Sequence, residues 1–218
     1  MKFSGVNLLD ELAREDMHEL RGLIGARTFP GGSIIFTPDT EENLVFIVSR
    51  GRVRIYLAYE DKEFTLGILN PGDVYSTHSD CYVQALDDAE LLLTNVRSVK
   101  RIMDTMPDFT RTMVRVLGHI LKNSFLIIGG LAFKDIYTRL MEFLLAEARH
   151  SGVKREDGVL VTLDLTIEQL AQLMGATRQT VSTLLGDMAR AGLVLKQARR
   201  VYLIPDMAAL EKAALADS

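Results

Sequence analysis

The stretch from Thr166 to Gly192 constrains the fold most strongly, because it carries two short amphipathic helical patterns separated by a turn at Gly175. In the first pattern, Thr166 stands at an N-cap position and Gln169 follows at capping-box spacing. In the second pattern, Thr177 can cap a helix whose first residues are polar. A cap, an apolar face, a glycine turn and a second capped helix in this order predict a helix-turn-helix.

The second helix of this motif has the side chains of a DNA-reading helix. Its inward face consists of apolar residues at helical spacing: Val181, Leu184, Leu185 and Met188. The polar side chains near its start point outward: Arg178, Gln179, Ser182 and Thr183. An arginine can bind guanine O6/N7 in a bidentate manner, and a glutamine can do the same to adenine N6/N7. We therefore expect these four residues to contact DNA; the alternative is a solvated helix face that contacts nothing.

Positive charge is concentrated around the same motif, although the whole chain is acidic with a net charge of −4. From Arg178 to Arg200 there are five basic residues and one acid, Asp187. Phosphate attraction acts over about a Debye length, roughly 8–10 Å, so a local patch matters more than the average charge. We expect Arg199 and Arg200, in the predicted two-stranded wing LVLKQARRVYLIP, to contact DNA as well.

The first hundred residues have a different pattern of apolar and turn-forming residues. A helical pattern covers Leu8 to Ile24, and short β-rich runs then fill Arg27 to Arg97. Turn signals such as Gly31-Gly32 and Pro71-Gly72 separate these runs. Strands at this spacing predict an all-β roll, with one hairpin that turns at Glu60 to Lys62.

The stretch from Pro107 to Ala132 predicts one long helix that is apolar on two faces. One stripe consists of Met113, Leu117, Ile120, Ile127 and Leu131, and the other of Val114, Leu121, Phe125 and Ile128. A helix with two apolar faces must bury both of them. We expect one face to pack on the chain's own β-roll and the other on a symmetry mate, which gives a C2 homodimer.

These patterns predict an α+β fold with three parts. We expect a β-roll sensor domain with an N-terminal helix over residues 1–106, a dimerisation helix over 107–132, and a winged helix-turn-helix domain over 133–218. The expected partner is double-stranded DNA. The sequence contains no nucleophile–base–acid set, phosphate loop or metal-spaced cluster, so we do not expect an enzyme.

Composition indicates where the protein works. We expect no apolar run to be long enough to span a membrane. Acidic residues follow the N-terminus at the place where a signal peptide would have its apolar core. We therefore expect a cytoplasmic protein without a membrane partner. The single cysteine, Cys81, excludes an internal disulfide framework and a multi-cysteine zinc or iron–sulfur site within one chain.

A β-roll, a long helix and a C-terminal winged helix-turn-helix, in this order, resemble the CRP/FNR superfamily of transcription regulators. The segment TRQTVSTLL is similar to the superfamily's recognition helix. The resemblance implies a homodimer that binds pseudo-palindromic DNA, with RNA polymerase as a further partner. Its half-sites would lie about one helical turn, roughly 34 Å, apart.

The effector differs between subfamilies. Cyclic-nucleotide binders carry a Gly-Glu start followed by an Arg-Ser/Thr-Ala cassette. Here Gly72-Asp73 stands at the start, and VYSTHSDCYVQA has no basic residue except His78, so a cyclic phosphate would lack its counter-charge. PGDVYSTHSDCYVQA instead resembles the haem segment of the carbon-monoxide-sensing haem regulators, the CooA family. ENLVFIVSRGRVRIYLAYEDKEFTL, VLGHILKNS and LAFKDI resemble the same family. The alternative is a superfamily member that senses nitric oxide or an organic effector without haem.

The resemblance implies haem b, with His78 as one iron ligand and the N-terminal amine of Met1, from the other subunit, as the opposite one. At pH 7, deprotonation costs about 1.4 kcal/mol for an amine of pKa ~8 and about 4.6 kcal/mol for the Lys2 side chain at ~10.4. The α-amine is therefore the better ligand. Asn43 is implied as the partner of the second ring nitrogen of His78; the other interpretation of Asn43 is an ordinary turn residue.

The resemblance also implies how the signal travels. CO would displace the amine and lie beside Leu117, Gly118 and Leu121 of the long helix, although the two leucines are equally explained by dimer packing. A hinge at Phe133, Lys134 and Asp135 would then re-aim the DNA-binding domains.

One departure from the family concerns the ferric state. Some members use a cysteine two residues before the histidine as the ferric ligand, and Ser76 stands there in this chain. A neutral hydroxyl is a poor iron ligand beside a thiolate. Cys81 could substitute for it, or could be an ordinary buried thiol.

Overall fold

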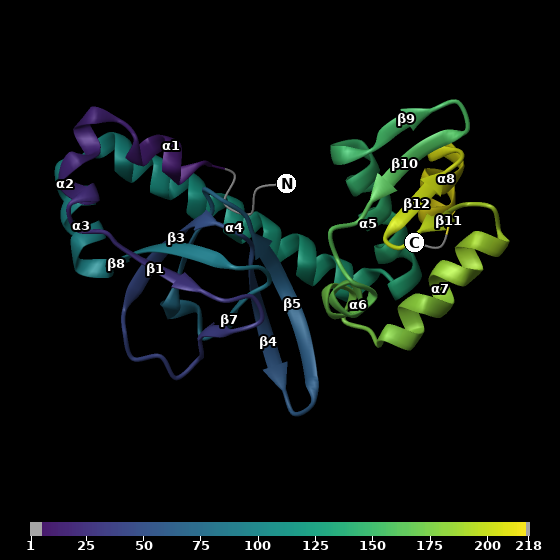
Figure 1. Cartoon of the computed structure of the whole chain (residues 1–218), viewed down its shortest axis with the longest axis horizontal. Helices are drawn as coiled ribbons and strands as arrows, with labels where there is room; N and C mark the ends of the chain where they lie inside the picture. The colour runs from purple at the N-terminus through teal and green to yellow at the C-terminus, as the bar shows by residue number, and fades with distance from the viewer. Residues whose placement is uncertain (1–5, 217–218) are drawn as a thin grey trace. The chain divides into compact units, whose positions relative to one another are not determined.

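The computed structural model describes residues 6–216, which divide into two compact units (Figure 1). The first unit comprises Met1–Lys62 and Leu66–Phe125, and the second comprises Glu63–Thr65 and Leu126–Ser218. Both units contribute to the long helix, which the sequence-based division at residues 106 and 133 treats as a separate segment.

Two four-stranded sheets form a β-roll in the first unit. One has the order β1 (Gly25–Phe29), β8 (Ala89–Asn95), β3 (Leu44–Arg50) and β6 (Val74–Ser76). The other has the order β2 (Ile34–Phe36), β7 (Tyr82–Ala85), β4 (Val53–Tyr59) and β5 (Lys62–Leu69). Phe46, Ile55 and Leu91 are among the side chains buried in the core of the roll. The predicted roll is confirmed, and so is the hairpin, whose turn contains Glu60 with φ +55°.

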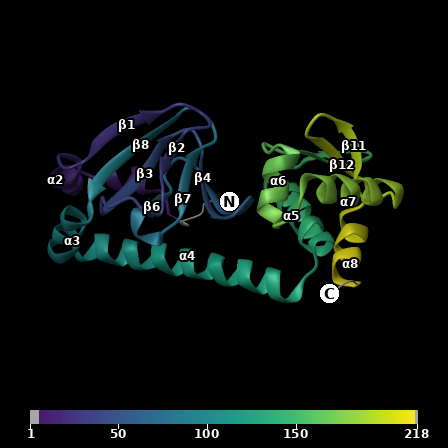
Figure 2. The same ribbon diagram turned by 90° about the horizontal axis from the view of Figure 1, so that it is seen from below.

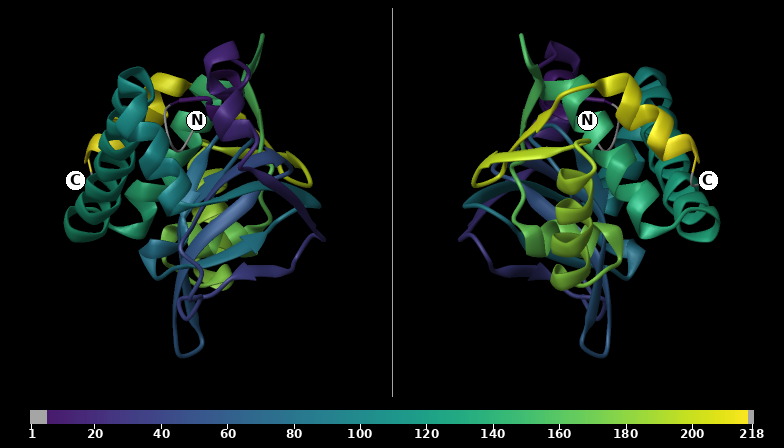
Figure 3. Two further views of the ribbon diagram at one scale, coloured as in Figure 1. Left: turned by 90° about the vertical axis from the view of Figure 1, so that its left-hand side faces the viewer. Right: turned by 90° about the vertical axis from the view of Figure 1, so that its right-hand side faces the viewer.

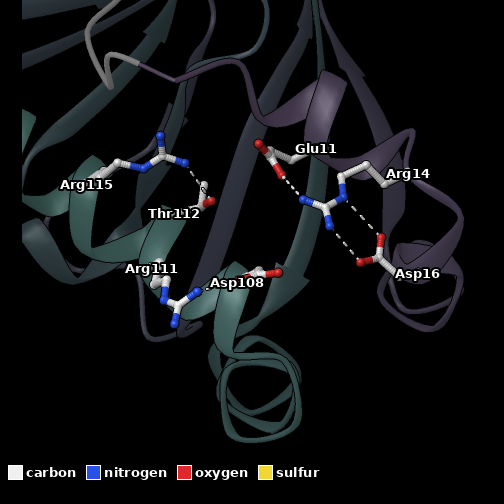
Figure 4. A network of polar contacts seen from close by, with 7 residues as sticks. All are labelled: Glu11, Arg14, Asp16, Asp108, Arg111, Thr112 and Arg115. Carbon is white, nitrogen blue, oxygen red and sulfur yellow. Dashed lines mark hydrogen bonds and ion pairs between the residues drawn. The ribbon is translucent and has the colours of Figure 1, made fainter.

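The N-terminal segment is not the single helix that its periodicity predicts. It consists of α1 (Leu8–Leu12), the 3₁₀ turn η1 (Glu15–Met17) and α2 (His18–Arg21). Arg14 has an extended backbone with ψ 147°, and this conformation separates α1 from η1. Its guanidinium pairs with Glu11 at 3.2 Å and with Asp16 at 2.9 Å (Figure 4). These side-chain contacts favour the break, and periodicity does not reveal them.

Gly72 connects this N-terminal segment to the roll. Its carbonyl accepts a hydrogen bond from the N–H of Leu8 at 2.9 Å, and its φ of +92° is a conformation that favours glycine. A Cβ at this position would overlap the side chain of Asn7. Glycine therefore allows the turn before β6 to lie against the N-cap of α1.

Two helices follow the roll: α3 (Val96–Thr105), which the sequence analysis missed, and α4 (Pro107–Phe133). The predicted long helix is confirmed, and the structure shows which of its residues face the roll. Phe109 and Val116 are buried in the cluster that α1 and α3 also line, and Met113 and Ile120 pack partly against it. Figure 2 shows the first part of α4 running beneath the strands of the roll. Leu117 and Leu131, which share a predicted stripe with Met113 and Ile120, are 61% and 48% exposed. The covered side therefore combines only part of that stripe with Phe109 and Val116.

The opposite face of α4 is apolar and exposed. It includes Val114, Leu117, Leu121, Phe125, Ile128 and Leu131. An 18-residue window of this helix has a mean hydropathy of 1.5, so length and composition alone would let α4 cross a membrane. This corrects the expectation that no apolar run is long enough. One such helix is weak evidence for a membrane span, because the core helix of a soluble protein passes the same test.

The second unit is a winged helix-turn-helix. It contains the helices α5 (Ile136–Ser151), α6 (Ile167–Met174), α7 (Arg178–Arg190) and α8 (Met207–Ala216). Its sheet has the order β11 (Leu195–Ala198), β12 (Val201–Ile204), β10 (Gly158–Thr162) and β9 (Val153–Arg155). The predicted helix-turn-helix and wing are confirmed. The right panel of Figure 3 shows this unit with α8 and the wing in yellow. Strand β9 and helix α8 were not predicted from the sequence.

Candidate DNA-reading and effector sites

Local hydrogen bonds hold the helix-turn-helix in the geometry that the sequence predicts. Thr166 and Gln169 form a complete capping box, with hydrogen bonds of 3.1 Å and 2.8 Å between each side chain and the other residue's backbone N–H. Gly175 ends α6 with φ +61°. Thr177 then caps α7 by accepting a hydrogen bond from the N–H of Thr180 at 3.1 Å. Both helix starts are therefore fixed by residues of the motif itself.

This geometry separates the two faces of α7. Val181, Leu185 and Met188 are buried in the core of the unit, and Leu184 packs partly against it. The predicted DNA-contacting side chains all lie on the exposed face: Arg178, Gln179, Ser182 and Thr183. At the tip of the wing, Arg200 has φ +63° and Arg199 is exposed. The arrangement leaves all these polar groups accessible to a nucleic acid, although their contacts with DNA stay a prediction.

The candidate haem ligand, His78, lies on the short 3₁₀ turn η2 (Thr77–Ser79) that follows β6. Its side chain is exposed. Its Nδ1 lies 2.9 Å from Oγ of Ser76, which also accepts a hydrogen bond from the N–H of His78 at 3.2 Å. In the tautomer whose Nδ1–H donates to Ser76, the Nε2 lone pair remains available to a ligand-binding metal.

Hydroxyl groups attach this turn to the neighbouring strand. Oγ1 of Thr77 donates to the carbonyl of Glu42 at 2.6 Å and accepts a hydrogen bond from the N–H of Leu44 at 3.0 Å. Ser79 donates to the carbonyl of Ser76 at 3.2 Å, and Asp80 ends the turn with φ +50°. The imidazole is therefore carried on a turn that is held both internally and by the start of β3.

The other residues that the resemblance assigned to the haem region do not all lie beside His78. In this structure the imidazole ring of His78 is hydrogen-bonded to Ser76. The backbone carbonyl of Asn43 accepts a hydrogen bond from the N–H of Val96 at 3.1 Å. A role for Asn43 beside a bound haem stays a prediction. Met1, the expected second ligand, lies outside the described residues. Cys81 is buried in the core of the roll, and its Sγ contacts the carbonyl of Ser79 at 3.2 Å. This position suits an ordinary buried thiol.

Tyr75, on β6, lies next to this turn. Burial raises the pKa of its phenol to about 12. Its ring stands 6.2 Å from that of Phe46, measured between centroids. The apolar surroundings of β6 thus continue to the residue that precedes Ser76, where the chain becomes accessible.

The proposed CO-pocket residues Leu117, Gly118 and Leu121 share the exposed face of α4. A Cβ at Gly118 would have no atom within 4 Å, so another group can approach the helix backbone there. The predicted hinge coincides with a break in helical structure: α4 ends at Phe133, and Asp135 caps α5 by accepting a hydrogen bond from the N–H of Thr138 at 2.7 Å. A hinge function for these residues stays a prediction.

Arg139 is a residue of this region that the sequence analysis missed. Its guanidinium donates to the carbonyls of Lys134 at 2.7 Å and Gly130 at 3.3 Å, and to the carbonyl of Met174 at 2.8 Å. It thereby connects the end of α4 to the end of α6. Because helix C-termini carry partial negative charge, a guanidinium is suited to this position.

Two family models match the chain. A Crp-like helix-turn-helix domain covers residues 138–213, and a cyclic nucleotide-binding domain covers residues 26–106. A solved structure of a CooA mutant from Carboxydothermus hydrogenoformans is 40% identical, covers 98% of this chain and 100% of its own, and has a TM-score of 0.90. The chain belongs to the CRP/FNR family of transcription regulators. The predicted resemblance and fold class are confirmed.

Further CRP/FNR relatives are named for different signals. A structure of the "CO-dependent transcription factor CooA" from the same organism is 42% identical over 98% of each chain, with a TM-score of 0.56. The "heme domain of CooA" is 46% identical over 58% of this chain and 94% of its own, with a TM-score of 0.51. The "Global nitrogen regulator" of Synechocystis sp. is 29% identical and covers 77% of this chain and 79% of its own length. The family is thus shown, whereas its relatives are named for different signals.

Proposed function

We propose that this CRP/FNR regulator is a haem-dependent CO sensor that binds DNA as a homodimer. The observation that carries the proposal is the η2 turn, on which His78 is exposed and, among the described residues, Ser76 alone engages its ring, at Nδ1. The similarity to CooA structures named for CO and for haem supports it. Haem, when bound, would supply an iron that can bind an imidazole and CO.

The residues present fit such a group. His78 would hold the iron through Nε2, while Ser76 fixes the orientation of the ring. By the resemblance to CooA, Leu117 and Leu121 on the exposed face of α4 would exclude water beside the group. An apolar environment suits CO, because bound O₂ gains more from hydrogen-bond donors.

We propose that a second copy of the chain, rather than a membrane, covers this face of α4. This face of α4 presents Val114, Leu117, Leu121, Ser124, Ile128 and Leu131. These residues are separated alternately by three and four positions, which is the spacing of a two-stranded coiled coil. The dimer would then place two copies of α7 at half-sites of one pseudo-palindromic operator. RNA polymerase is the proposed further partner, and the cytoplasm the proposed location.

Absorption spectroscopy of purified, haem-supplemented protein tests the proposal. We expect a Soret band that shifts on reduction with dithionite and again on addition of CO. His78→Ala should lose the ferrous spectrum of the wild type, and His18→Ala, an exposed histidine on α2, should keep it. Absence of a Soret band after supplementation would refute the haem assignment. An unchanged ferrous spectrum in His78→Ala would refute the ligand assignment alone.

The second candidate is a CRP/FNR regulator that senses nitric oxide or an organic effector without haem. The match to the cyclic nucleotide-binding domain model and the likeness to a global nitrogen regulator favour it. A cyclic nucleotide itself fits poorly, because Val74 to Ala85 carries no basic side chain except His78. Thermal stabilisation of haem-free protein by an organic effector, together with no response to CO, would select this candidate.

A further inference from the structure

The winged helix unit contains a groove of about 370 Å³ between the start of α6, the start of α7 and the wing. Its apolar part is formed by Leu163, Leu165, Ile167 and Tyr202. Its charged part is formed by Arg178, Lys196, Arg199, Arg200 and one acid, Glu168. Every one of these residues belongs to the second unit, so the groove is complete within it.

The basic side chains of the groove are unpaired. Among the described residues, none of Arg178, Lys196, Arg199 and Arg200 makes a side-chain hydrogen bond or an ion pair, whereas Arg190 of the same helix pairs with Asp187. The four cations and Glu168 leave a formal charge of +3 around one opening. Such a concentration of like charge raises the local concentration of anions.

Tyr202 adds a second, independent feature. This residue on β12 is only 4% exposed, it lines the groove, and its hydroxyl has no hydrogen-bond partner among the described residues. Burial raises the pKa of the phenol, which therefore remains a hydrogen-bond donor at neutral pH. Because the hydroxyl oxygen itself remains accessible, it can donate a hydrogen bond to a molecule in the groove.

The shape and the floor of the groove indicate the kind of molecule. A phosphate of the DNA backbone is entirely polar and gains nothing from leucine and isoleucine side chains. Small-molecule pockets, in contrast, have volumes of about 300–1,000 Å³ and apolar linings with a few convergent polar groups. The groove matches this description, because its lining combines apolar side chains with a few cationic ones.

We propose that this groove binds a small organic anion, with an apolar body on Leu163, Leu165 and Ile167 and a carboxylate, sulfonate or phosphate group toward Arg200, Lys196 and Tyr202. Because Arg178 belongs both to the groove and to the DNA-reading face of α7, an occupant competes with DNA. The site is thus a second effector site, separate from the η2 turn, and its ligand lowers the affinity for DNA. Only this competition depends on the proposed DNA-binding function.

Isothermal titration calorimetry with two probes of nearly equal shape tests the binding step without DNA. Naphthalene-2-sulfonate carries the anionic group, and naphthalene-2-sulfonamide is its neutral counterpart. We expect the sulfonate to bind at least about tenfold more tightly than the sulfonamide, and Arg200→Gln and Lys196→Gln each to weaken it by about fivefold or more. Tyr202→Phe should weaken it by a smaller factor. Arg155→Gln, which removes an exposed charge of the same unit outside the groove, should leave it unchanged.

Several outcomes would overturn the proposal. Equal binding of both probes would assign them to exposed apolar surface such as that of α4, and unchanged binding in folded Arg200→Gln would place the site elsewhere. A further such outcome is that inorganic phosphate inhibits DNA binding as strongly as the sulfonate does. That result would show that the groove binds only a phosphate of the DNA backbone. In a second arm, excess duplex DNA should release the bound sulfonate. If the sulfonate binds but duplex DNA does not, the groove stands and the proposed DNA-binding function fails.

Discussion

The exposed face of α4 leads to a quantitative prediction for Leu121→Ala. Leu121 is 54% exposed within one chain, and Leu117 beside it is 61% exposed. Complete burial of a leucine side chain stabilises by about 1.5–3 kcal/mol, so covering the exposed half of Leu121 contributes about 1 kcal/mol. In a C2 dimer the substitution occurs twice, and the loss is therefore about 2 kcal/mol.

A loss of about 2 kcal/mol corresponds to a roughly thirtyfold increase in the dimer dissociation constant. The double variant Leu117→Ala/Leu121→Ala should lose about 4 kcal/mol, close to a thousandfold. Cavities left between the helices would increase both figures. Unfolding of the monomer should change little, because neither side chain is part of the buried cluster that holds α4 to the roll.

Sedimentation equilibrium over a wide range of protein concentrations measures these constants. Leu215→Ala is the matched control, because Leu215 also lies on a helix and is 71% exposed, but on α8. Its dimer dissociation constant should equal that of the wild type. An equal constant in Leu121→Ala would refute the assignment of this face to a second copy. Flotation of the wild type with liposomes would instead identify a membrane as the cover.

Three further predictions concern single contacts. Arg139→Gln removes the hydrogen bonds to both helix ends, including that to Met174, and should lower the free energy of unfolding by about 2–4 kcal/mol in urea titrations. Thr77→Val detaches the η2 turn from β3 and should lower the affinity for haem without changing the far-ultraviolet circular dichroism spectrum, whereas Thr77→Ser should retain the affinity. The hydrogen bond from Arg52 holds the pKa of Asp87 below its usual value, so an NMR titration should give a higher midpoint in Arg52→Gln. Since this pKa is depressed in the folded state, the stabilisation is present at neutral pH and is lost as the pH falls through the folded pKa.

The helix-turn-helix could be predicted from the sequence because its determinants are local. Thr166, Gln169, Gly175 and Thr177 act on backbone groups no more than a few residues away, and the structure contains each of these interactions. Local signals of this kind do not depend on the rest of the fold. For the same reason the turn at Glu60 and the two-stranded wing were predicted at nearly the correct residues.

The phase of α4 could not be predicted in the same way. Apolar residues occur nearly all round this helix, so periodicity does not decide which of them face the roll. The decision depends on partners distant in sequence: Phe109 and Val116 pack in a cluster with Leu8 and Ile102. The hydrogen bond from Arg139 to the carbonyl of Met174, 35 residues away, likewise could not be found by a pattern search. Contacts of this type need the fold before they can be recognised.

Ser76 shows how the two kinds of information combine at the candidate haem site. The sequence comparison identified this position as a departure, because a hydroxyl cannot replace a thiolate as an iron ligand. In the structure the hydroxyl makes two other hydrogen bonds, one with the backbone N–H of His78 and one with Nδ1 of its ring. A cysteine would make both less well, because sulfur is a weak hydrogen-bond acceptor. Serine therefore favours a fixed imidazole over a second ligand at the same turn, and a sensor built this way would depend on His78 in both oxidation states.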